Sequence, residues 1–289
     1  MWIRWMWVRL INEWLPRIRI RIHLLFWVVI GLSFVTGNFT EIMTLFVIVI
    51  IHEMGHVAAA TELGWTVSEI KLLPFGGVAT VEEAVASQPL DEIIMAVAGP
   101  FMNVTMILLA QFLWWAGIWS ADWAEFFITS NWIIAGFNLL PIWPLDGGRI
   151  VQALLCYLWP YGTAARFSLG TSVVFAAVML GLGCFFLNPN LVMLAVYLLF
   201  INMQAFIRFP YQFIRFLMEK YIAGQEHLPL RSVSLSPDVT VKEAAEQLRR
   251  GSYHLFLIRG PEGGLLAEEQ LLEAVLFQHQ RDIAVSRLL

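Results

Sequence analysis

The chain has 289 residues, of which 59% are hydrophobic and 14% are charged, against roughly half and a quarter in soluble globular proteins. That apolar fraction is too high for a single water-soluble core. The formal net charge is −4, and only three of the eighteen Lys and Arg residues lie between Ile22 and Ile207, which argues against nucleic acid as the main partner. The composition therefore indicates a multi-pass membrane protein with a small soluble tail.

The first 21 residues are rich in tryptophan and arginine, which is typical of a segment that lies in the membrane interface. Six apolar stretches follow that are long enough to cross a bilayer, which takes about 20 residues. They span residues 22–37, 42–61, 93–117, 126–158, 168–187 and 191–207. The first stretch could instead be a signal peptide, but its long basic leader and the poor cleavage site at 33–37 favour a retained span.

Basic residues in the loops predict the orientation, because they accumulate on the cytoplasmic side. The turns at 37–41, 117–125 and 187–190 contain no Lys or Arg, whereas the N-terminal segment, the alternate loops and the C-terminal exit do. Both termini are therefore predicted to be cytoplasmic. Tryptophans gathered around 114–123, at an outer turn, agree with this because Trp favours the membrane interface.

The predicted domains follow from these changes in composition. They are an interfacial segment at 1–21, a six-span domain at 22–208, a linker at 209–224 and a small α/β domain at 225–289. In the tail we expect a short strand, then a helix over 240–250 with a capping box of Thr240 and Glu243. A strand pair that begins with a strand at 252–259 and has a turn at 260–264 follows, and then a second helix at 268–278. A unit of ~60 residues is marginal alone, so we expect it to pair with another surface.

The second apolar stretch contains the sequence His52-Glu53-Met54-Gly55-His56. Histidines four residues apart lie on one face of a helix, so both imidazoles can bind one zinc ion. Glu53 lies beside them and can accept a proton from the attacking water. Ionisable side chains in an apolar helix are costly unless they are used. At about 1.5 Å per residue, His56 lies about 9 Å and His52 about 15 Å from a helix end at Glu62, which makes the site intramembrane.

A catalytic zinc ion normally has three protein ligands, and the third ligands of soluble families are absent here. Ala59 and Glu62 occupy the offsets where an HxxGxxH continuation would place its residues. Gly76 stands where a downstream glutamate would be. Glu82 and Glu83 are conceivable ligands, but they follow a loop that contains proline and glycine.

Asp146 is the better candidate for the third ligand. A lone carboxylate in an apolar span needs a cation or a partner. Pro141 and Pro144 break the helix just before it, which membrane proteins tolerate where the backbone is buried in protein or lines a cavity. The predicted topology places this segment at the same depth as His56.

The HEMGH sequence and the later sequence Asn138-Leu-Leu-Pro-Ile-Trp-Pro-Leu-Asp146-Gly-Gly resemble the paired motifs of the site-2 protease family of intramembrane zinc metalloproteases. This resemblance implies that His52, His56 and Asp146 hold one zinc ion per protomer. It also implies that Glu53 activates water and that Asn138 polarises or positions the scissile peptide. The implied fold is an α-helical polytopic membrane protein with six spans, a re-entrant loop or hairpin, and a small C-terminal α/β domain.

Within this family, the layout and the Leu72–Gly77 sequence most resemble the members that process pro-sigma-K during sporulation. The resemblance implies a membrane-associated precursor, pro-sigma-K, that is cut near the cytoplasmic face. It further implies contact with membrane lipid, membrane proteins that inhibit or regulate the enzyme, and a location in the mother-cell membrane around the forespore.

Residues 71–81 contain Pro74 and the pair Gly76-Gly77, so they cannot form a simple helix. We interpret them as a re-entrant loop or hairpin whose open edge pairs with an extended substrate; a plain cytoplasmic turn is the alternative. Residues 98–103 resemble the third-span motif of the family, and their small side chains would allow close helix packing. A catalytic role for this motif competes with a purely structural one.

Other polar residues receive simpler interpretations. Asn131 is expected to make hydrogen bonds between helices. The remaining histidines are expected to be interfacial or solvated rather than ligands. They are His23, His227, His254 and His279.

The tail resembles a single CBS domain, a module that usually binds adenosine nucleotides in pairs. This resemblance implies ATP as a ligand and a homo-oligomer that brings two copies together. However, Ala267 and Gln270 stand where nucleotide-binding copies often have Ser or Thr and then Asp, so the usual ribose-binding carboxylate is missing. Docking of the substrate or of a partner is the competing role.

Two other functions compete with proteolysis. In a membrane transporter, His52, Glu53 and Asp146 would line an ion path, but the sequence shows none of the internal repeats that many transporters have. A non-catalytic scaffold would be expected to have lost a ligand or the base, and all of them are present. The sequence therefore predicts an intramembrane zinc protease.

Overall fold

The computed structural model describes residues 19–22, 24–73, 76–82, 88–224, 228–260 and 263–289, and within these ranges it describes side chains for residue 28, residues 30–65 and residues from 88 onward. The chain forms two compact units. One contains Met1–Ala84 and Ile93–Leu140, and the other contains Val85–Glu92 and Pro141–Leu289.

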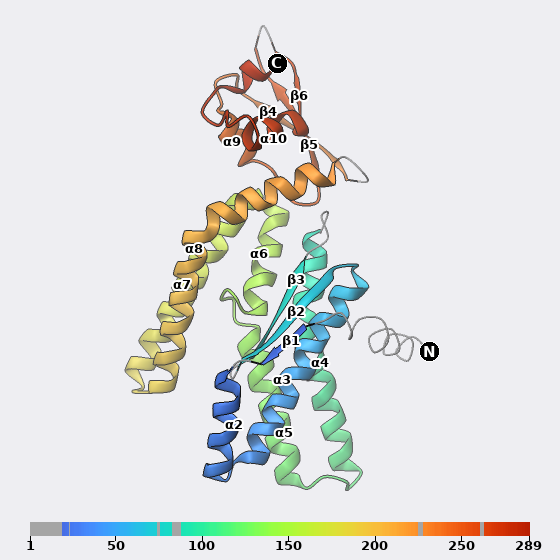
Figure 1. Cartoon of the computed structure of the whole chain (residues 1–289), viewed down its shortest axis with the longest axis vertical. Coiled ribbons are helices and arrows are strands. Elements are labelled where there is room, and N and C mark those ends of the chain that lie inside the picture. The colour runs from blue at the N-terminus through green and yellow to red at the C-terminus, as the bar shows by residue number, and fades with distance from the viewer. Residues whose placement is uncertain (1–18, 23, 74–75, 83–87, 225–227, 261–262) are drawn as a thin grey trace. The chain divides into compact units, whose positions relative to one another are not determined.

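The first unit combines helices with a small sheet (Figure 1). Its helices are α2 (Leu24–Thr36), α3 (Phe39–Glu62), α5 (Ala121–Asn138) and all but the first turn of α4 (Pro89–Trp115). Helix α5 begins where Ser120 caps it, because the backbone N–H of Trp123 donates to the Ser120 hydroxyl at 3.4 Å. Its last residue is Asn138, at the start of the segment that the prolines interrupt.

The sheet of this unit has the strand order β1-β2-β3, with strands at Arg19–Ile22, Thr66–Leu73 and Gly76–Glu82. Strands β2 and β3 form an antiparallel hairpin in which Leu73 lies opposite Gly76, and both contact α3. The hairpin expected around 71–81 is confirmed. Strand β1 pairs with β2 in parallel, which corrects the assignment of its residues to the interfacial segment and the first span. Its alternation of arginine and isoleucine has the period of a strand.

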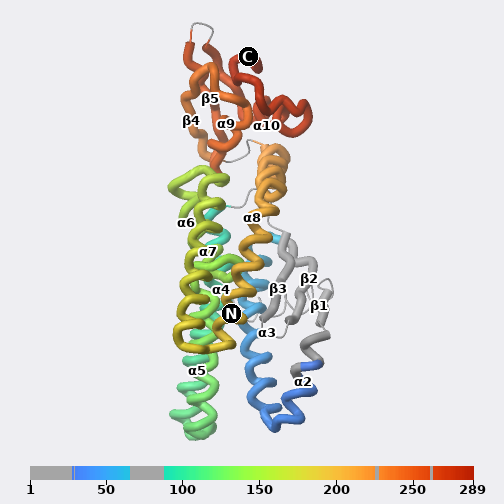
Figure 2. Tube along the Cα trace, turned by 90° about the vertical axis from the view of Figure 1, so that its left-hand side faces the viewer, coloured from blue at the N-terminus to red at the C-terminus, as the bar shows by residue number. Residues whose placement is uncertain are grey.

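The second unit begins with α6 (Asp146–Leu158), α7 (Tyr161–Phe185) and α8 (Pro189–Ala223). Helices α7 and α8 lie side by side, as Figures 1 and 2 both show. The side-chain oxygen of Asn188 accepts the N–H groups of Asn190 and Leu191 at 3.1 and 3.2 Å, and Pro189 opens α8. Asn and Pro are favoured at these two positions of a helix start. Helix α8 continues through 209–223, the residues expected as a linker.

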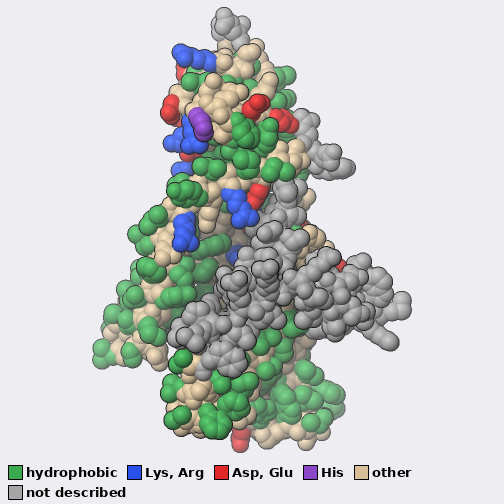
Figure 3. Space-filling view, in the orientation of Figure 1, with side chains coloured by type: hydrophobic (Ala, Val, Ile, Leu, Met, Phe, Trp, Pro, Cys, Tyr) green, Lys and Arg blue, Asp and Glu red, His purple; other side chains and the backbone are tan. Residues whose placement is uncertain are grey.

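Four of the described helices are long and apolar enough to cross a membrane, namely α3, α4, α7 and α8. In the most apolar 18-residue stretch of each of these helices, between 22% and 44% of the residues are buried inside the protein. Hydrophobic side chains cover much of the described helix surface in Figure 3. The chain is therefore a helical membrane protein. Helix α2 has only 13 residues, and the predicted span 126–158 is divided between α5 and α6.

The tail folds as a small α/β domain. Its elements are β4 (Leu230–Leu235), α9 (Val241–Ala245), β5 (Tyr253–Ile258), β6 (Leu265–Ala267), α10 (Glu268–Leu276) and a 3₁₀ turn at Val285–Leu288. Strand β5 is central, parallel to β4 and antiparallel to β6. The order of elements and the capping box of Thr240 and Glu243 agree with the prediction, although α9 ends at Ala245 and is shorter than expected.

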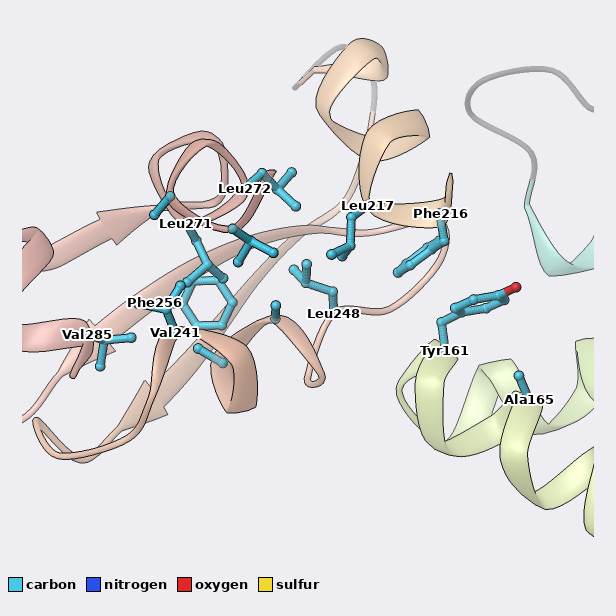
Figure 4. Packing of buried hydrophobic residues seen from close by; sticks show 14 of the residues in the cluster. Tyr161, Ala165, Phe216, Leu217, Val241, Leu248, Phe256, Leu271, Leu272 and Val285 are labelled. Atoms are coloured by element: carbon cyan, nitrogen blue, oxygen red, sulfur yellow. The ribbon is translucent and has the colours of Figure 1, made fainter. Parts of the chain in front are cut away.

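The core of the tail continues onto helices α7 and α8 of the same unit (Figure 4). Phe256 and Leu271 are fully buried in the middle of the tail, and Leu217 of α8 belongs to the same cluster. The rings of Tyr161 and Phe216 stack with centroids 4.2 Å apart. A domain of this size buries too little surface alone, and these contacts extend its core.

Candidate metal centre

Helix α3 carries His52 and His56 on one face, as the spacing predicts. Their side chains are only 2% and 7% exposed. The two Nε2 atoms lie 3.2 Å apart. Two ligands at tetrahedral angles and about 2.0–2.1 Å from zinc would be about 3.3 Å apart, so the histidine pair already has the spacing of zinc ligands.

Helix α4 engages the other nitrogen of each ring. The Nδ1 atom of His56 lies 2.7 Å from the carbonyl oxygen of Met95, and the Nδ1 atom of His52 lies 2.5 Å from Oδ1 of Asn103. A carbonyl oxygen can only accept, so His56 donates its Nδ1–H and its Nε2 carries the lone pair. Metal-binding histidines usually have this arrangement, in which an outer acceptor fixes the ring.

Gly99 of α4 packs closely against both imidazole rings. A Cβ atom at this position would lie 2.6 Å from Nε2 of His52 and would overlap Nε2 of His56. No side chain larger than hydrogen fits there without displacing the imidazoles. The small residues of 98–103 thus do more than allow helix packing, because this glycine makes room for the two imidazoles.

Asp146 is the first residue of α6 and follows the non-helical residues 139–145. The backbone of this segment is held at Trp143, whose N–H donates to the hydroxyl of Ser172 at 3.0 Å. The side-chain amide of Asn202 donates to the carbonyl of Trp143 at 2.6 Å. A Cβ at Gly148 would lie 2.6 Å from backbone atoms of Ile142 and Trp143, so the segment folds tightly back on the start of α6.

Among the described residues, His52, His56 and Asp146 form a group that could hold a metal ion: one ligand atom from each lies within 4.8 Å of the others. The Oδ2 atom of Asp146 is buried. Two imidazole nitrogens and a carboxylate oxygen are a donor set that catalytic zinc sites use. The residues present therefore fit a zinc ion.

The remaining predicted site residues have different surroundings. Glu53 adjoins His52 in α3 and is partly buried. Asn138 is partly buried, and its side-chain N–H donates to the carbonyl of Ile134 at 3.1 Å. The side chain of Glu82, one alternative third ligand, and the whole of Glu83 lie outside the described residues.

The structure shows what two polar features of the sequence do. Asn103, in the 98–103 motif that was interpreted as either structural or catalytic, lies beside His52, although 51 positions separate them in the chain. Asn131 accepts a hydrogen bond from Asn103, which confirms the hydrogen bond between helices that was expected of it. A side-chain amide in an apolar span indicates that a polar partner lies nearby. The sequence separation of Asn103 and His52 does not identify that partner. His254 was expected to be interfacial or solvated. It is instead fully buried, and its ring forms a hydrogen bond with Glu268 inside the tail.

Comparison with known proteins places this geometry in a family. The model of Peptidase family M50 matches residues 40–122. Stage IV sporulation protein FB of Bacillus subtilis (strain 168) is 31% identical over 286 residues, which cover 96% of this chain and 99% of that relative. Zinc metalloprotease MJ0392 of Methanocaldococcus jannaschii is 26% identical over 235 residues, 78% of this chain and 66% of that one.

A solved structure agrees with the sequence relatives. The site-2 protease from Methanocaldococcus jannaschii matches with a TM-score of 0.53 and 28% identity, covering 65% of this chain and 90% of that chain. The likeness to stage IV sporulation protein FB extends over nearly the full length of both proteins. The chain belongs to peptidase family M50, the site-2 protease family, and is a zinc-dependent intramembrane protease.

Proposed function

We propose that His52, His56 and Asp146 are the protein ligands of a single catalytic zinc ion. The observation that supports this set is that one ligand atom from each side chain lies within 4.8 Å of the others. Both histidine Nδ1 atoms already have oxygen partners, which leaves the Nε2 atoms for the metal.

Glu53 is proposed as the general base. A zinc ion held by His52, His56 and Asp146 would supply Lewis-acid chemistry to the scissile carbonyl and the attacking water. Glu53 adjoins His52 in α3, and its carboxylate takes a proton from the attacking water. It then delivers that proton to the nitrogen of the leaving amine, so that the amine departs as a neutral group.

Asn138 and the β2–β3 hairpin are proposed to position the scissile peptide. Asn138 is the last helical residue before the segment that leads to Asp146, and its amide offers both a donor and an acceptor. Strand β3 contacts α3, and on its outer edge it pairs with none of the described strands. An extended substrate adding to this edge would satisfy its backbone hydrogen bonds there.

The proposed substrate is pro-sigma-K, processed in the mother-cell membrane around the forespore. The likeness to a stage IV sporulation protein over 96% of the chain supports a role in sporulation. Membrane proteins that inhibit or regulate the enzyme belong to the same proposal. Because the chain is a family M50 protease, the transporter and scaffold alternatives lose their basis.

The proposed topology has six spans and two cytoplasmic termini. Helices α2 and α5 are its additional spans, with 13 and 18 residues. The uncharged turn after α7 supports an outward-facing position for residues 187–190, because Lys and Arg collect on the cytoplasmic side.

The tail is proposed to dock the substrate or a second protomer. ATP is the alternative ligand that its CBS-like sequence suggests. Gln270 stands where a ribose-binding carboxylate is often found, and its side-chain oxygen accepts the N–H of Ala267 at 3.2 Å. This hydrogen bond closes the start of α10, which favours docking over nucleotide binding.

The variant Glu53→Gln tests the proposed mechanism. It should lower cleavage of pro-sigma-K by about 10²–10⁴-fold, since that is what a general base contributes, while zinc per chain stays at the wild-type value. Purified full-length protein would be assayed for metal content and for cleavage. Glu62→Gln, on an exposed residue of the same helix, is the matched control and should behave like the wild type.

Cleavage at the wild-type rate by Glu53→Gln would remove Glu53 as the base. Active wild-type protein that leaves pro-sigma-K intact but cuts another membrane-associated precursor would overturn the substrate alone.

A further inference from the structure

A line of three hydrogen bonds leads from His52 into the helices around it. The Nδ1 atom of His52 lies 2.5 Å from Oδ1 of Asn103 on α4. The amide nitrogen of Asn103 donates to Oδ1 of Asn131 on α5 at 2.9 Å. The amide nitrogen of Asn131 donates to the carbonyl oxygen of Phe127, also at 2.9 Å. His52, Asn103 and Asn131 are each at most 2% exposed.

The carbonyl of Phe127 fixes the direction of this line. A backbone carbonyl accepts and cannot donate, so the side of Asn131 that faces Phe127 must be its NH₂ group. The oxygen of Asn131 therefore faces Asn103 and requires the NH₂ group of Asn103. The oxygen of Asn103 is then left to face His52, and it can only accept a hydrogen bond.

The consequence for His52 is a single neutral tautomer. Its Nδ1 must carry the proton and donate to Asn103, so its Nε2 presents a lone pair. His56 is fixed in the same tautomer by the carbonyl of Met95. Two lone pairs then face one another across 3.2 Å, an arrangement that is repulsive by itself and favourable once a cation lies between them.

We propose that Asn103 and Asn131 are positioning residues that fix the tautomer and ring orientation of His52 and thereby set the affinity of the metal site. The inference rests on the proposed zinc ligands. Asn131 acts without touching a ligand. If its acceptor oxygen is lost, Asn103 can turn over and present its NH₂ group to His52, which then carries its proton on Nε2 and cannot bind metal through that atom.

The experiment compares four variants of the full-length protein. Asn103→Leu removes the acceptor of His52, and Asn131→Leu removes the acceptor of Asn103. Asn131→Asp keeps that acceptor, because a neutral carboxylic acid can accept from Asn103 and donate its O–H to Phe127; burial disfavours the charged form. Ser130→Ala alters the buried neighbour of Asn131 on the same helix and serves as the control.

Two readouts are independent of proteolysis. Competition with a zinc chelator gives the zinc affinity, and the visible absorption of protein loaded with Co²⁺ reports the geometry of the ligands. Asn103→Leu and Asn131→Leu should bind zinc about 10–100-fold more weakly, as loss of an outer hydrogen-bond partner typically does, and should show a weaker cobalt spectrum. Asn131→Asp and Ser130→Ala should stay within a few-fold of the wild type.

Unchanged zinc affinity and cobalt spectra in both leucine variants would overturn the proposal. So would equal losses in Asn131→Asp and Asn131→Leu, because the acceptor at 131 would then not matter. If a leucine variant does not fold, Asn131→Ala removes the acceptor with less steric change and is interpreted in the same way. Wild-type protein without zinc would instead contradict the ligand set itself, so the two failures are distinguishable.

Discussion

At the scale of single residues, the metal centre depends on the lack of a side chain at one position as much as on the side chains around it. Gly99 lies where a Cβ would meet both Nε2 atoms. The two imidazoles are buried and each is held at Nδ1, so neither can rotate away without breaking a hydrogen bond. A methyl group at this position would therefore have to displace the imidazoles from these positions.

The substitution Gly99→Ala should abolish zinc binding, or weaken it by at least the 10–100-fold expected for a lost outer partner, and cleavage should fall with it. Zinc per chain after dialysis and cleavage of the same substrate are the measurements. Gly136→Ala is a suitable control, because a methyl group added at position 136 would have no heavy atom within 4 Å and alanine favours helix by about 1 kcal/mol over glycine. Full zinc content in Gly99→Ala would show that the helices yield and that the space is not critical.

The proposed metal ligands could be predicted from the sequence, whereas the residues that support them could not. Histidines at i and i+4 on a helix share a face whatever the tertiary structure is, and a lone carboxylate in an apolar span is conspicuous. Asn103 meets His52 only because α4 packs beside α3. No local periodicity carries that information, so the hydrogen bond became visible only in three dimensions.

At the scale of elements, the break between α5 and α6 was predictable and its stabilisation was not. Pro141 and Pro144 interrupt the helical pattern. The residues that hold the freed backbone of Trp143 are Ser172 and Asn202, 29 and 59 positions away. Both are fully buried, as expected where a non-helical backbone inside a membrane protein needs partners. The pair of helices α7 and α8 thus supports the segment that leads to Asp146.

The orientation of that helix pair can be checked with a native cysteine. Cys184 is exposed next to the end of α7, whereas Cys156 is buried. If residues 187–190 face away from the cytoplasm, a membrane-impermeant maleimide should label Cys184 in intact, non-sporulating cells that express the protein in their plasma membrane, and Cys184→Ser should lose the label. Labelling confined to inside-out vesicles would reverse the proposed topology, because the turn after α7 would then be cytoplasmic.

At the scale of the whole molecule, α8 links the apolar helices of the second unit to the tail through buried charges. Lys220 near the end of α8 donates to the carbonyl of Ser252 at 2.7 Å and pairs with Glu268 at 2.8 Å. The other oxygen of Glu268 accepts the backbone N–H and the Nδ1–H of His254 at 2.7 and 2.8 Å. Breaking such a buried group leaves an uncompensated charge, so the tail is firmly joined to this helix.

This network makes the tail sensitive to acid. The Nε2 atom of His254 accepts the backbone N–H of Arg249 at 3.3 Å, which requires the neutral ring. Burial lowers the pKa of His254, an effect that Lys220 and Arg231 reinforce and that Glu268 only partly offsets. Burial alone would raise the pKa of Glu268, but its contacts with His254 and Lys220 outweigh this and lower it. For both groups the unfolded state therefore binds more protons than the folded state.

The stability contributed by His254 is thus present above its unfolded pKa of about 6.5 and is lost as the pH falls through its lower folded pKa. One titrating group changes the free energy of unfolding by at most about 1.4 kcal/mol per pH unit. Hydrogen exchange of peptides from 228–289 in the full-length protein, corrected for its intrinsic pH dependence, should speed up as the pH falls below that value. His254→Asn should remove this increase in exchange rate. It should leave the further increase at lower pH that the protonation of carboxylates causes. The control His279→Asn changes an exposed histidine and should keep the pH dependence of exchange seen in the wild type. If His254→Asn also keeps the wild-type pH dependence, the acid sensitivity of the tail arises from another group.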